Sequence, residues 1–242
     1  MGGLLPDAWA YLTAGSHWTG AGGMGALLLQ QLLLTLTALA VAAAVGLPVA
    51  LYLGHLGRGG TVAINVSNVG RAVPTFAVLV LLSVGPAGTG VLGPYGRAGF
   101  ATLVALVAFA LPPIITNAYV AMREVPGAVR EAATGTGMSG GQLFARVELP
   151  LAAPLVAAGL RMALVQVWAT ATIAALVAGP GLGNVITAGF YRSNYGKGFA
   201  GAVVVAAVAL VLELLAAAGQ RMVDPARRIA AAPGGLRRAA HR

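Results

Sequence analysis

The most informative absences in this sequence are those of cysteine and of charge. Its 242 residues include no cysteine, which excludes a disulfide framework and thiol chemistry. Aspartate and glutamate together number six, and charged residues make up 9% of the chain, whereas an average soluble domain carries roughly 25%. So low a charge content excludes an ordinary soluble globular protein.

Long apolar runs take the place of the missing charges. Hydrophobic residues account for 58% of the chain, and the mean hydropathy is +0.85. The runs are continuous and rich in alanine and leucine instead of alternating, which favours membrane-spanning helices over membrane-spanning strands. We therefore predict an all-α, polytopic membrane protein with one helical membrane domain.

Five of these runs are long enough to cross a bilayer, which takes about 20 apolar residues. Gly46 and Pro48 are expected to bend the first run, and Pro112-Pro113 to interrupt the third. The second run is polar, so it either faces protein or water, or lies at the cytoplasmic surface and begins to cross near Ala72. The five predicted spans are residues 27–53, 61–84, 100–122, 151–178 and 199–218.

The composition divides the chain into three parts. Residues 1–25 form a glycine-rich lead without the basic and apolar regions of a signal peptide, and we expect it outside the cytoplasm. Residues 26–219 hold the spans, and residues 220–242 form a basic tail. The net charge of +9 indicates contact with the anionic inner leaflet, and no nucleic-acid partner is expected.

A polar island at residues 124–150 separates the third and fourth runs and holds three of the six acidic residues. Its pattern predicts two short helices around a turn. Gly137 suits a backbone with positive φ just past a helix end, and Ser139 suits the N-cap of the second helix. Leu149-Pro150 is expected to end that helix. By pattern alone, an ordinary polar loop would explain the island equally well.

The exact residues of the island resemble the EAA motif of ABC importer permeases. Glu131-Ala132-Ala133 is followed by three residues, Gly137, nine residues and Val147-Glu148-Leu149-Pro150, and only valine for isoleucine departs from the family pattern. In that family this cytoplasmic loop, here residues 123–150, docks on an ATPase subunit. The resemblance implies the type I importer permease fold, with small side chains allowing close approach and Glu131 supplying a charged contact or a cap. The implied coupling residues are Glu131, Ala132, Ala133, Gly137, Leu149 and Pro150.

Three further stretches resemble permeases for glycine betaine, carnitine and choline. They are residues 71–75, with arginine in place of the family's glutamine, residues 111–119 and residues 169–186. The resemblance implies an osmoprotectant cargo, a translocation pathway and a tight glycine turn. The implied pathway residues are Arg71, Pro74, Thr75, Asn117, Thr170 and Thr172, and the implied turn residues are Gly179, Gly181 and Gly183.

The distribution of basic residues agrees with one orientation. If residues 123–150 are cytoplasmic, five spans put the N-terminus outside and the C-terminus inside. Ten of the fifteen basic residues then lie inside and three outside, as the positive-inside rule requires. Arg161, within the fourth span, either faces the bundle or a wet cavity, or snorkels inward if the span begins near Ala157. A structural role, through backbone carbonyls or Glu213, is the favoured interpretation.

The sequence shows no enzyme constellation, and we expect no cofactor or metal on this chain. The glycine run lacks the Lys-Ser/Thr of a Walker A site, so ATP would be hydrolysed by another subunit. The resemblance implies a bacterial plasma-membrane location and four partners: ABC ATPases, an extracytoplasmic substrate-binding protein, a second permease chain (identical or related) and the lipid bilayer. Two alternatives are an ABC permease for another small solute such as methionine, and a channel or secondary carrier, for which such a loop has no purpose.

Overall fold

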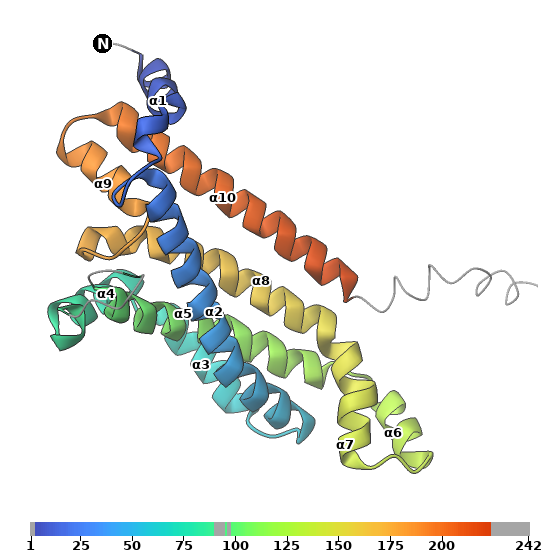
Figure 1. The fold of residues 1–242 in the computed structure, drawn as a ribbon. Coiled ribbons are helices and arrows are strands. Elements are labelled where there is room, and N and C mark those ends of the chain that lie inside the picture. The colour runs from blue at the N-terminus through green and yellow to red at the C-terminus, as the bar shows by residue number, and fades with distance from the viewer. Residues whose placement is uncertain (1–2, 90–94, 96–97, 224–242) are drawn as a thin grey trace, which may run out of the picture.

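The computed structural model describes residues 3–89, 95 and 98–223. Within these ranges the chain is helical and contains no strand, which confirms the predicted all-α membrane class. Most of the helices cross one another in a single bundle, with short helices at both ends (Figure 1). Four helical segments are long and apolar enough to cross a membrane. They are α2 (Met24–His55), α5 (Gly99–Arg123), Gly140–Val177, which includes α8 (Leu149–Ile173), and α10 (Tyr195–Met222).

The core lies where α2, α5 and α8 meet. Small side chains allow these helices to approach closely, as is usual between helices in lipid. A Cβ atom on Gly54 of α2 would lie 2.6 Å from Met122 Cβ of α5, and one on Gly159 of α8 would lie 2.6 Å from Asn117 Cβ. The buried core residues are Leu34, Ala38, Ala42, Leu106, Ala110, Ile114, Ala163, Val167 and Ala171.

The run predicted over residues 61–84 is not one continuous helix, because two helices replace it. Helix α3 (Gly60–Ala72) ends before Val73, and α4 (Thr75–Val84) begins after Pro74. Pro74 has the extended backbone of an N-cap, and the residue before a proline avoids the α conformation. The ten residues of α4 cover about 15 Å, half of the ~30 Å hydrocarbon core.

Three other prolines, Pro112, Pro113 and Pro150, do not interrupt their helices, contrary to expectation. Helix α5 continues through Pro112-Pro113. The ring of Pro112 lies against Gly70 of α3, where an added Cβ would overlap Pro112 Cγ. Leu149-Pro150 also fails to end a helix. There, one π turn (Phe144–Glu148) joins α7 (Gly140–Leu143) to α8, and Pro150 falls in the first turn of α8, where its missing N–H costs little.

The lead contains a helix that the sequence did not indicate. Helix α1 (Leu4–Thr13) packs on α10, and a Cβ on Gly196 would lie 2.6 Å from Asp7 Cβ. Helix α9 (Gly183–Tyr191) shares this end of the bundle, whereas α6 (Gly127–Gly135) and α7 lie at the opposite end (Figure 1). Three short 3₁₀ turns complete the described chain: Gly15–His17, Pro86–Gly88 and Ala174–Val177. The predicted tail lies outside the described residues from position 224 onward.

Candidate coupling and translocation sites

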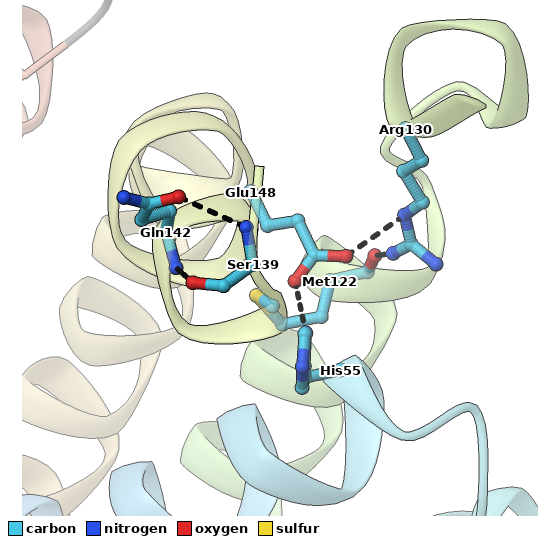
Figure 2. Close-up of polar contacts among 6 residues, drawn as sticks. All are labelled: His55, Met122, Arg130, Ser139, Gln142 and Glu148. Carbon is cyan, nitrogen blue, oxygen red and sulfur yellow. Dashed lines mark hydrogen bonds and ion pairs between the residues drawn. The ribbon is translucent and has the colours of Figure 1, made fainter. Parts of the chain in front are cut away.

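The polar island forms the hairpin of α6 and α7 at one end of the bundle (Figure 1). Gly137, in the turn, has φ +86°, as predicted. Ser139 caps α7 in a capping box: Gln142 N donates to Ser139 Oγ at 3.4 Å, and Ser139 N donates to Gln142 Oε1 at 2.9 Å (Figure 2). Local turn chemistry therefore defines the shape of the hairpin, as the sequence pattern predicted.

The EAA-like residues of the hairpin mostly face outward. Glu131, Ala132 and Gly137 are exposed, and so is Pro150, while Leu149 is half-buried. Ala133 is the exception, with an exposed fraction of 8%. Helix α6 thus exposes Glu131 and Ala132 at its outer face and turns Ala133 toward its own chain.

A buried carboxylate, Glu148, lies beneath the hairpin. Its side chain is 1% exposed. Its Oε2 accepts a hydrogen bond at 2.5 Å from Nδ1 of His55, which is the last residue of α2. Arg130 Nε of α6 forms an ion pair with Oε1 at 3.0 Å, and Arg130 Nη2 donates to the carbonyl of Met122 in α5 (Figure 2). Sequence reasoning missed this cluster, since no local pattern predicts which charges pair across the fold.

The glycine turn after α8 has no room for side chains. Gly181 has φ +112°, a Cβ on Gly179 would lie 2.6 Å from the carbonyl oxygen of Ala174, and one on Gly183 would overlap the carbonyl oxygen of Thr172. Asn184 Nδ2 closes the turn by donating to the carbonyls of Gly179 and Gly181 at 2.9 and 3.0 Å. The turn is thus fixed by close backbone contacts.

Gln31 of α2 holds this turn against α8. The side chain is completely buried, and its Nε2 donates to Thr172 Oγ1 at 2.8 Å and to the Trp168 carbonyl at 3.3 Å. Its Oε1 accepts from Leu182 N, within the turn, at 2.8 Å. The signal in the sequence was a pair of glutamines, Gln30 and Gln31, within an apolar run, but it identified neither the buried member nor its partners.

The predicted pathway residues whose side chains the structure describes lie in different parts of the bundle. Thr172 is bound to Gln31, and Thr170 is buried and donates to the carbonyl of Gln166 at 2.8 Å. Pro74 is exposed at the start of α4 and Thr75 is half-buried, while the side chain of Arg71 lies outside the described residues.

Asn117 is the member of this set that lines a cavity, of about 200 Å³, between α3, α5 and α8. Its Nδ2 donates to the carbonyl of Pro113 at 2.8 Å. The lining of this cavity includes the polar side chains of Thr116, Asn117 and Gln166. The lining residues are Gly70, Pro112, Pro113, Thr116, Asn117, Met162 and Gln166.

Arg161 reaches from α8 to α10. Its Nε donates to Glu213 Oε1 at 2.7 Å, Nη2 donates to the same oxygen, and Nη1 donates to Gln220 Oε1 at 3.2 Å. Gln220 Nε2 in turn donates a hydrogen bond to the carbonyl of Pro154 in α8 at 3.3 Å. These contacts bridge the two helices, with Arg161 and Glu213 both lining an open cavity of about 470 Å³. In the described part of the chain, no group of three acidic or histidine side chains is placed to hold a metal ion.

Comparisons with known proteins match most of the chain. The profile of the family described as "Binding-protein-dependent transport system inner membrane component" matches residues 42–229. The choline transport system permease protein OpuBB of Bacillus subtilis is 29% identical over 81% of this chain and 87% of its own length. The osmoprotectant import permease protein OsmY of Salmonella typhimurium is 32% identical over 81% of this chain and 80% of its own.

Solved structures share the fold. The MetNI methionine ABC transporter, in an inward-facing conformation, has a chain that aligns with a TM-score of 0.69 and 20% identity, over 83% of this chain and 96% of that chain. A second crystal form of MetNI gives a TM-score of 0.65 at 22% identity. The arrangement of helices is therefore that of an ABC importer permease.

Proposed function

Because the chain belongs to the family of binding-protein-dependent transport system inner membrane components, we propose that it is the permease of an ATP-driven osmoprotectant importer. The cargo is a solute such as glycine betaine, carnitine or choline. The observation that carries this proposal is the 29–32% identity, over 81% of this chain, to permeases named for choline and osmoprotectants.

The proposed assembly contains two permease chains, identical or related, two ATPase subunits and a substrate-binding protein outside the cell. The exposure of Glu131 and Ala132 on α6 supports an ATPase contact at that end of the bundle. A charged side chain and a small one are accessible there to another subunit. Closure of the ATPases on ATP would displace the hairpin and rock the spans, so that the pathway opens alternately to the two sides. The polar cavity at Asn117 is where we place the solute contact.

Reconstitution tests the function directly. The chain is incorporated into proteoliposomes with the ATPase and binding proteins of its source cell, and uptake of radiolabelled glycine betaine, carnitine, choline and methionine is measured. We expect uptake of a quaternary ammonium solute that requires both ATP and a binding protein. Uptake of methionine alone would transfer the assignment to an amino-acid importer, and flux without ATP would indicate a channel or secondary carrier.

The proposed orientation has the N-terminus outside and the C-terminus in the cytoplasm. Since the chain lacks cysteine, Ser16→Cys near α1 and Ala128→Cys in α6 each introduce one exposed thiol, at opposite ends of the bundle. In intact cells, a membrane-impermeant maleimide should label residue 16 and leave residue 128 unlabelled until the cells are lysed. The reverse labelling pattern would contradict the orientation.

A further inference from the structure

Helix α6 is weakly anchored by apolar contacts. It has nine residues, fewer than an isolated helix needs to be stable in water, and Ala133 is its one buried side chain in the described structure. Val125, just before it, is also buried. The position of α6 relative to the spans must therefore depend on the polar contacts that it makes.

Arg130 provides those contacts. Its guanidinium donates to the Met122 carbonyl near the C-terminus of α5, where cations are favoured, and lies 3.0 Å from Glu148 Oε1. Arg130 and Glu131 are consecutive residues of α6 that point in different directions. Arg130 contacts the spans, and Glu131 is exposed on the outer face of the helix. A force applied to the outer face of α6 therefore acts directly on Arg130.

Glu148 connects Arg130 to a second span. Its other oxygen, Oε2, is bound by His55 at the end of α2. The Glu148 side chain is 1% exposed, whereas those of His55 and Arg130 are each 20% exposed. The neighbouring Gly54 lets the end of α2 lie directly on Met122 of α5. The Glu148 carboxylate, at the start of α8, thus contacts the end of α2 and the hairpin helix directly, and it is linked to α5 through Arg130 (Figure 2).

We propose that Glu148 is a positioning residue that transmits the displacement of α6 to the spans, through Arg130 and His55. This inference rests on the proposed function, since it assigns the internal link of the same coupling hairpin. A buried ion pair is poor evidence for stability as such, because its desolvation opposes its attraction. The ion pair with Arg130 and the hydrogen bond from His55, however, connect α6 to the end of α2, and Arg130 also donates to Met122 of α5. Such a connection is what transmission of movement requires.

Glu148→Gln keeps the shape of the side chain and removes its charge. In the reconstituted complex we expect uptake per ATP hydrolysed to fall about tenfold, within the usual range of coupling between sites, while assembly and ATP hydrolysis without substrate are unchanged. Glu124→Gln is the matched control. Glu124 is exposed, and its substitution removes the same charge from the same end of the molecule. Unchanged uptake per ATP in Glu148→Gln would overturn the proposal.

A second pair of variants covers the case in which Glu148→Gln does not assemble. His55→Asn keeps a side-chain donor close to the position of Nδ1, whereas His55→Ala removes it. We expect the ratio of uptake to ATP hydrolysis to be largely retained in His55→Asn and lost in His55→Ala, at equal amounts of assembled complex. Equal ratios in the two variants would reject the link.

The result separates this inference from the proposed function. If the unmodified complex shows no ATP-dependent uptake of any solute, the proposed function fails. If the unmodified complex transports and the variants retain normal coupling, the function stands and the role of Glu148 fails.

Discussion

Replacement of Gln31 by leucine is expected to destabilise the folded protein, even though leucine suits a membrane span better than glutamine. Gln31 is completely buried and supplies the acceptor for Leu182 N in the glycine turn. Leucine would leave that buried N–H unpaired, which costs about 1–3 kcal/mol. It would also remove the donor to Thr172 Oγ1 that ties α2 to α8. Thermal unfolding of the detergent-solubilised protein measures the effect.

The adjacent Gln30 provides the matched control. Gln30 is half-buried and makes no side-chain hydrogen bond within the described residues. Gln30→Leu changes the hydropathy of the span by the same amount, so it should leave the melting temperature nearly unchanged. If both leucine variants unfold at the same temperature as the unmodified protein, the hydrogen bonds of Gln31 do not stabilise the turn.

Length and hydropathy predicted α2, α5, α8 and α10 because both properties are local to a run of sequence. The effect of proline was not predictable in the same way. Pro74 separates two helices, whereas α5 continues through Pro112, whose ring lies against Gly70 of another helix. Pro150 is accommodated by a π turn before it. Each outcome depends on neighbours that the local sequence does not identify.

The same distinction applies to the sites. Within the hairpin, Gly137 and the capping box of Ser139 and Gln142 act over a few residues, so the pattern predicted them. The partners of Glu148 and Gln31 lie far along the chain: His55 is 93 residues from Glu148, and Leu182 is 151 residues from Gln31. Charge and polarity marked these residues as unusual, but only the packed helices decide which groups meet.

Substitution of Gly137 by valine is expected to uncouple transport without preventing assembly. Space is not the obstacle, because no atom lies within 4 Å of a Cβ added there, but φ +86° is a conformation that a β-branched residue adopts only with strain of about 1–3 kcal/mol. The turn would relieve this strain by shifting, and the hydrogen bonds from Gly137 N to Thr134 O and from Met138 N to Ala133 O would change. Helix α6 would then present Glu131 to the ATPase in the wrong position.

Gly135→Val separates backbone strain from side-chain bulk. Gly135 ends α6 with ordinary helical backbone, and its added Cβ also meets nothing within 4 Å, so valine there adds the same volume without the strain. We expect Gly137→Val to lower uptake per ATP hydrolysed about tenfold and Gly135→Val to lower it little. Glu131→Arg, which reverses the charge offered to the partner, should uncouple transport as Gly137→Val does. If Gly137→Val and Gly135→Val transport equally well, the positive φ of the turn is not needed for coupling, and the hairpin tolerates more than one shape.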